Sequence, residues 1–234
     1  MVGGAVSTPH SLIPRTNPAL QLEMKFWGGL AVIIAAIFGY WYSHRDIQYP
    51  PGVLVQSEPG QVLLPSNTSS IAHGAFTLKP LASFSVDARV LHRRNYRYDA
   101  GAKLVPVDLA LGWGVMSDQS VLDRMKINQS MRCYFYKYKL PPPIPVDDIV
   151  SHSSNMHIIP ATREIEARCK SLRNGALIRL VGDLVEATGP GINTWKSSLT
   201  RTDTGNGACE LFYVEDITEL PAGVRAETSV VATN

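Results

Sequence analysis

The sequence contains little cysteine and little charge. Only 3 of its 234 residues are cysteine and no two form a CxxC pair, which excludes a zinc ribbon and a dithiol redox motif. Charged residues make up 18% of the chain, and 22 basic residues against 20 acidic ones leave a net charge of +2. This balance excludes a mainly disordered chain and a protein that binds polyanions through bulk charge alone. The sequence also lacks a Walker loop, a nucleophile elbow and a GxGxxG motif.

Proline and glycine, in contrast, are frequent. The chain holds 16 Pro and 18 Gly, which favours a turn-rich β protein over a helical bundle. Its length suits one sizeable domain with a smaller appendage.

One long apolar run lies near the N-terminus. Nineteen residues without formal charge, FWGGLAVIIAAIFGYWYSH, separate Lys25 from Arg45. A hydrocarbon core of about 30 Å needs roughly 20 helical residues, so the run predicts a transmembrane helix over residues 23–45. Trp27 at one end and Trp41 at the other suit the headgroup level of a lipid bilayer.

The charges beside this run predict its orientation. Arg15 and Lys25 precede it, whereas Arg45 is followed by no further basic residue until Lys79. The positive-inside rule then places the N-terminus in the cytoplasm and everything after residue 45 on the far side of the membrane.

Small residues recur every four positions within the run. Ala31, Ala35 and Gly39 form one stripe, and such residues let helix backbones approach closely. The stripe predicts packing against another membrane helix, including self-association; the alternative is the ordinary abundance of Ala and Gly in spans.

Composition divides the rest of the chain. We expect a flexible tail over 1–22, a Pro-rich stalk over 46–75, a soluble β-rich domain over 76–220, and a second flexible tail over 221–234. The short apolar pieces of the stalk are able to dock on the domain. The domain is large enough to fold without disulfides.

The pattern inside the domain predicts an α+β fold that is mostly antiparallel sheet. Apolar and polar residues alternate over 83–90, as in a half-buried strand. Residues 162–173 read as a helix that Thr162 caps and Gly175 ends. Three further strands are expected at 176–187, 192–200 and 207–217. Together these elements indicate a small barrel or curled sheet with one or two helices.

Segment 176–217 resembles the oligonucleotide/oligosaccharide-binding (OB) barrel pattern, in which a strand such as IRLVGDLVEA leads into a hairpin. Residues 76–217 as a whole resemble uncharacterised single-pass bacterial envelope proteins that carry stretches such as PVDLALGWG, HSSNMHIIPA and SSLTRTDTGNGACEL. The resemblance implies an inner-membrane location and carries over no catalytic residue.

Three residues are candidate ligands. His152 and His157 stand five apart, and Asp203 lies in a Gly-rich turn. Imidazoles with a carboxylate are able to bind zinc or to serve as acid and base. Two histidines that bind zinc from one helix are usually four residues apart, and the sequence shows no obvious third ligand here. A structural role is therefore favoured for His152 and His157, and we expect no metal or cofactor.

A basic, aromatic stretch is the candidate interaction surface. This stretch places positive charge beside aromatic rings at Arg93, Arg94, Tyr96 and Arg97. Such a surface is able to bind single-stranded nucleic acid or anionic lipid headgroups. The alternative is a face that contacts only solvent. Trp113 between two glycines is either an exposed recognition residue or part of the core.

The expected function is a protein-binding or scaffolding module of an envelope assembly, with a membrane or periplasmic protein as partner and no enzymatic activity. The alternatives are a membrane-tethered hydrolase or metal enzyme that uses His152 and His157, and a cytoplasm-facing OB-like domain that binds nucleic acid. Nucleic acid is the less favoured partner. The pattern leaves open whether any two of Cys133, Cys169 and Cys209 form a disulfide.

Overall fold

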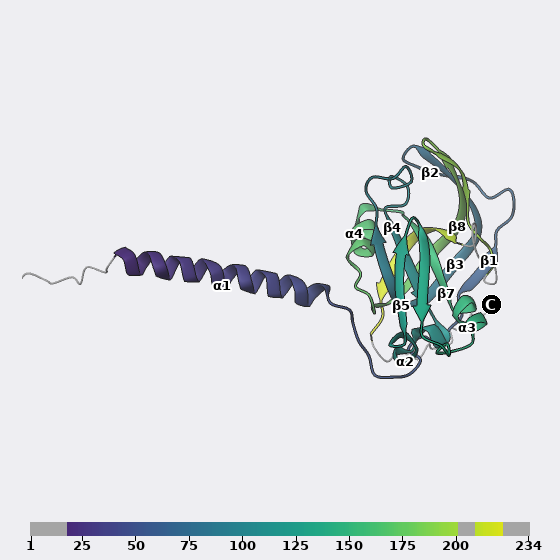
Figure 1. Cartoon of the computed structure of the whole chain (residues 1–234). Helices are drawn as coiled ribbons and strands as arrows, with labels where there is room; N and C mark the ends of the chain where they lie inside the picture. Colours follow the sequence, from purple (N-terminus) through teal and green to yellow (C-terminus); the bar gives the residue numbers. More distant parts are fainter. Residues whose placement is uncertain (1–17, 201–208, 222–234) are drawn as a thin grey trace, which may run out of the picture. The chain divides into compact units, whose positions relative to one another are not determined.

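The computed structural model describes residues 18–200 and 209–221, which fall into two compact units divided after Arg45 (Figure 1). The first unit contains one helix, α1 (Pro18–His44). Its segment Leu22–Tyr42 is long and apolar enough to cross a membrane, and every side chain of that segment is exposed. A helix that is apolar on all sides is typical of a membrane span. The structure confirms the expected apolar helix; the small-residue stripe remains a prediction.

In the second unit, five strands pair in a closed ring. β3 (Phe76–Asn95) pairs with β4 (Val107–Gly112), β4 with β7 (Ser153–Pro160), β7 with β10 (Glu210–Glu219), β10 with β8 (Leu177–Gly189), and β8 again with β3. Only the pairing of β7 with β10 is parallel. The predicted, mostly antiparallel sheet is therefore confirmed.

The hydrophobic core fills the inside of the ring. Alternate residues of each strand point inward, as the expected alternation over 83–90 requires. The largest of these side chains include Phe84 and Phe212, whose ring centroids lie 5.1 Å apart in an edge-to-face arrangement. Gly182 of β8 has a φ of +157°, and a Cβ atom there would lie 2.0 Å from the carbonyl oxygen of Tyr213, so glycine allows these two strands to approach.

The helix α4 (Arg163–Ser171) connects β7 to β8 and packs Ile165 and Cys169 against this core. Thr162 Oγ1 accepts a hydrogen bond from the backbone N–H of Ile165 at 3.2 Å, and Gly175 follows the helix with a φ of +87°. The predicted helix and its Thr162 cap are thus confirmed, whereas the predicted stop at Gly175 is wrong, because the helix already ends at Ser171 and the next residue, Leu172, is extended.

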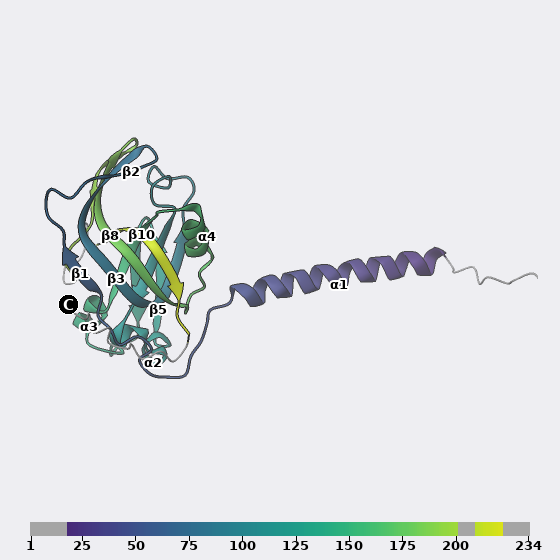
Figure 2. The same cartoon turned by 180° about the vertical axis from the view of Figure 1, so that it is seen from behind.

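A second, smaller sheet lies beside the ring (Figures 1 and 2). It is a hairpin of β5 (Met125–Ser130) and β6 (Cys133–Tyr138). The short helices around it are η1 (Gly114–Ser117), α2 (Gln119–Leu122) and α3 (Val146–Ser151). β9 (Ile192–Lys196) extends the main sheet beyond β8.

The segment expected as a stalk instead belongs to the domain. β1 (Gly60–Leu63) and β2 (Ile71–His73) both pair with β3, and Val55 is buried in the core. Ahead of them, the Ile47 N–H donates to the Asn174 carbonyl at 2.8 Å, and the amides of Leu54 and Val55 both donate to Ser117 Oγ at 3.0 Å. These partners lie far away in the sequence, so a composition argument could not reveal them.

A buried arginine completes this attachment. The Arg89 side chain donates to the carbonyl oxygens of Ser117 (3.0 Å) and Ile47 (3.3 Å) and to the Gln119 amide oxygen. Its guanidinium also lies 5.0 Å from the Tyr49 ring centroid. One side chain therefore joins residues 47–49 to the sheet.

Candidate functional site

Polar side chains gather on the outer face of the ring, at β4 and β7. Because strand side chains alternate, Leu109 and Met156 point into the core whereas Asp108 and His157 point outward. Asp108 and His157 are direct cross-strand partners, and His157 Nδ1 lies 3.0 Å from Asp108 Oδ1. Both side chains are almost fully buried, so other parts of the chain cover them.

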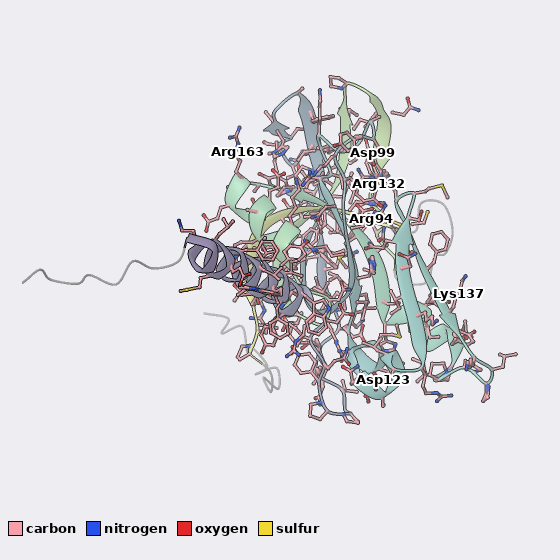
Figure 3. All side chains as sticks on the ribbon, turned by 60° about the vertical axis from the view of Figure 1, so that its left-hand side comes forward. Arg94, Asp99, Asp123, Arg132, Lys137 and Arg163 are labelled. Carbon is pink, nitrogen blue, oxygen red and sulfur yellow. The ribbon has the colours of Figure 1, made fainter. Side chains whose placement is uncertain are left out.

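Arg132 provides much of that cover. It occupies the turn of the β5–β6 hairpin with a φ of +64° and donates to Asp108 Oδ1 at 2.9 Å. The same guanidinium binds both carboxylate oxygens of Asp99, at 2.7 and 3.1 Å, and lies 3.6 Å from the Tyr96 ring centroid. Figure 3 shows Asp99 and Arg132 next to each other. Two carboxylates and one aromatic face thus fix the position of this arginine.

Asn155 extends the cluster toward the start of β10. Its Nδ2 atom donates to the Arg132 carbonyl at 3.1 Å and lies 3.7 Å from the Cys209 Sγ atom. Its Oδ1 atom accepts from Gln129, whose own amide oxygen lies 3.0 Å from His92 Nδ1. We refer to Asp108, Arg132, Asn155, His157 and Cys209 as the polar cluster.

The electrostatics of the polar cluster favour a charged histidine. Burial lowers the pKa of His157, but hydrogen bonds with Asp108 and with Cys209 outweigh this effect and raise that pKa to about 9. The Trp195 ring packs edge-on against the imidazole with a centroid distance of 4.8 Å. Asp108 Oδ2 is buried and has no hydrogen-bond partner among the residues that the structure describes. Burial and the nearby Asp108 together raise the pKa of Tyr96.

A second feature is a groove of 410 Å³ between the β3–β4 loop and α4. Arg97 and Lys103 come from the loop, whereas Arg163 and Lys170 come from the helix. Lys170 forms an ion pair with Glu166, which is the one acidic residue among the described residues that line the groove. Within residues 18–200 and 209–221, the side chains of Arg97, Lys103 and Arg163 form no ion pair. We call this feature the basic groove; Figure 3 shows Arg163 on its helix side.

The expected interaction surface is divided between these two features. Tyr96 and Arg97 line the basic groove, and Arg94 is exposed on the same strand end (Figure 3). Arg93 is half-buried near the end of β3. Trp113 does not belong to any surface, because it is fully buried and its indole N–H donates to Glu58 at 2.9 Å.

The two candidate histidines are held by different partners. His152 follows α3, where Nδ1 contacts the Asp148 carbonyl at 2.9 Å and Nε2 lies 3.4 Å from Glu58 Oε1. His157 belongs to the polar cluster. Asp203 lies outside the described residues. Within the described part of the chain, no group of three or more His, Cys, Asp or Glu side chains is placed to hold a metal ion.

Sequence reasoning missed Asp108, Arg132 and Cys209 as members of a site. A signal for Asp108 was present, because a carboxylate stands between apolar residues in the strand VPVDLALG. Its partner is set by strand register and a hairpin turn, which a single sequence does not show. No family model matches this chain, and comparisons with curated proteins and with solved structures also found no match.

Proposed function

We propose that this chain is a single-pass protein of the bacterial inner membrane, with its N-terminus in the cytoplasm and its β domain in the periplasm. The domain acts there as a protein-binding module of an envelope assembly. Its basic groove receives an acidic segment of the protein partner. The observation that carries this proposal is the convergence on one groove of cations from two separate elements that form no ion pair within the described part of the chain.

The strand order supports a binding module of the OB type. In chain order, the five ring strands are β3, β4, β7, β8 and β10, and they pair as first–second–third–fifth–fourth–first. A helix, α4, connects the third and fourth strands. An OB barrel is a five-stranded Greek-key barrel that binds ligands on its second and third strands and on adjoining loops. The β3–β4 loop, which forms one side of the basic groove, occupies such a position.

The charge of the groove selects the class of partner. Arg97, Lys103 and Arg163 oppose the single carboxylate of Glu166, which already binds Lys170. Carboxylates on an extended segment would pair with these cations, and the arginines are able to bind them in a bidentate manner. The Tyr96 ring offers a flat apolar wall beside the charges.

Binding of a defined peptide tests the proposal. The full chain in detergent should bind a fluorescein-labelled decapeptide of alternating Glu and Gly, measured by anisotropy, and should not bind the same peptide with Gln for Glu. The double variant Arg97→Glu, Arg163→Glu should weaken binding at least about tenfold. The control Lys126→Glu, Lys139→Glu makes an equal change in net charge on the exposed β5–β6 hairpin and should leave binding unchanged.

Two results would overturn this function. One is equal loss of peptide binding in both double variants, which would indicate attraction by net charge alone. The other is tighter binding of a single-stranded oligonucleotide than of the acidic peptide, with a steep salt dependence, which would favour a nucleic-acid-binding domain.

A further inference from the structure

The β5–β6 hairpin has one face packed on the domain and one face open. Tyr136 and Tyr138 of β6 pack against buried residues that include Ile149, whereas Lys137 and Lys139 alternate with them and are exposed. Figure 3 shows Lys137 on this hairpin. The outer face of the hairpin is therefore basic.

Two lysines face each other on the outer face. Lys126 and Lys137 are direct cross-strand partners, and like charges in this position destabilise a strand pair. Arg124 and Lys139 add two further cations at the same end of the hairpin. Within residues 18–200 and 209–221, none of these four side chains forms an ion pair. A bound anion would relieve the repulsion between the two lysines.

The four cations line a cleft of 540 Å³ that also has apolar walls. These walls come from Met125, Tyr138 and Leu140, and Leu140 is 85% exposed. Among the described residues that line the cleft, Asp123 is the one acidic residue, and its Oδ1 atom accepts a hydrogen bond from the Gln119 amide at 2.7 Å. A ligand in this cleft therefore meets several positive charges beside an apolar surface.

The cleft lies beside the residues with which the domain begins. The Gln119 amide that binds Asp123 also donates to Gln48 Oε1 at 2.6 Å. In the sequence, only residues 43–47 separate Gln48 from Tyr42, the last residue of the apolar segment of α1. Because so few residues intervene, a bilayer that α1 crosses is held at high effective concentration near this end of the domain.

We propose that this cleft binds the phosphate groups of anionic phospholipids in the bilayer that α1 crosses. We call it the hairpin site; its members are Arg124, Lys126, Lys137, Lys139 and Leu140. Basic side chains attract anionic headgroups, and an exposed apolar side chain suits the boundary between headgroups and acyl chains. A peptide of acidic residues would match the charges but would offer no apolar partner to Leu140.

A second contact with the bilayer has a structural consequence. The few residues after α1 leave the domain free to turn, whereas the hairpin site would hold one face of it toward the headgroups. The inference rests on the membrane span of the proposed function, but on neither the basic groove nor the direction in which α1 crosses.

Lysine acetylation of the unaltered full chain tests the inference. The chain is placed in nanodiscs of phosphatidylcholine alone, or of equal parts phosphatidylcholine and phosphatidylglycerol, and treated with N-hydroxysuccinimidyl acetate, which carries no charge. Measured by mass spectrometry, the three lysines of the hairpin site should react at least about threefold more slowly in the anionic discs, because phosphates cover them. Lys79 and Lys103, which are exposed elsewhere on the domain, should react equally fast in both discs. Equal rates at the hairpin lysines in the two discs, or equal slowing at Lys103, would overturn the proposal.

Charge reversal identifies the residues responsible. Lys126→Glu with Lys139→Glu should abolish the slowing at Lys137, and the matched pair Arg97→Glu with Arg163→Glu should retain it. Slowing that persists in the first double variant would count against the hairpin site. Binding of the acidic peptide should respond to the second pair alone, so this inference and the proposed function fail separately.

Two competing ligands are tested in the phosphatidylcholine discs. Neither inorganic phosphate nor the decapeptide of Glu and Gly should slow the acetylation of Lys137. Slowing by inorganic phosphate as large as that by phosphatidylglycerol would show a site that needs no bilayer, and slowing by the peptide would show a second peptide-binding surface. Either result would contradict the inference.

Discussion

His157 Nδ1 lies 3.0 Å from Asp108 Oδ1, between two residues that face each other directly on β7 and β4. Burial lowers the pKa of His157, but this contact and the nearby Cys209 outweigh burial and raise that pKa from 6.5 to about 9. A group whose pKa is raised by folding stabilises the protein fully below its unfolded pKa and loses that contribution as the pH rises through its folded pKa.

We therefore expect the free energy of unfolding to fall by about 3 kcal/mol between pH 6 and pH 10, as the raised pKa of this one group requires. Denaturation at several pH values, followed by circular dichroism, measures the change. His157→Gln should remove most of the dependence and His152→Gln should retain it. An unchanged pH dependence in His157→Gln would show that the buried contact does not set it.

Arg89 should contribute strongly to stability because three acceptors depend on it. Arg89→Met should lower the free energy of unfolding by about 3 kcal/mol, because buried acceptors lose a charged donor. Amide hydrogen exchange of residues 47–55 should become faster in this variant. The control Arg179→Met removes an exposed ion pair with Asp87 and should cost less than about 1 kcal/mol. Similar losses in the two variants would argue against the anchoring role of Arg89.

The two tryptophans should respond differently to truncation. Trp113 is fully buried, so Trp113→Ala should cost about 3–5 kcal/mol in unfolding free energy. Trp195 is only half-buried, against His157, and Trp195→Ala should cost about half as much. Chemical denaturation of both variants measures the difference, and the reverse order would contradict the placement of these side chains.

A reporter fused after Asn234 tests the proposed topology. With the helix Leu22–Tyr42 as a single span and the N-terminus in the cytoplasm, alkaline phosphatase fused there should be active and green fluorescent protein should be dark. The opposite pattern would place the domain in the cytoplasm. It would also favour the nucleic-acid alternative.

The parts of the fold that were predictable depend on local pattern. The apolar run before Arg45 predicts α1 because no face of that helix is polar. The spacing of Ile165, Cys169 and Leu172 predicts α4, and alternation over 83–90 predicts part of β3. In each case the information lies within a single helix or a single strand.

The parts that were not predictable depend on distant partners. Residues 46–75 read as a stalk because their composition is Pro-rich, yet Arg89 and Ser117 hold them from 42 and 62 positions away. His157 was recognised as a candidate, but its partner is set by the register of β7 on β4, and Arg132 reaches both through a hairpin turn. The spacing of His152 and His157 suggested a pair, whereas the structure gives each a different carboxylate.

Photo-crosslinking in living cells tests the central claim, which is that the basic groove binds a protein partner. p-Benzoylphenylalanine at Lys103, in the groove, should give one discrete crosslinked protein band after irradiation, and the band should weaken when Arg97→Glu and Arg163→Glu are also present. p-Benzoylphenylalanine in place of Lys139, on the exposed end of the β5–β6 hairpin, should give no such band. No product from position 103, or the same product from both positions, would contradict the account.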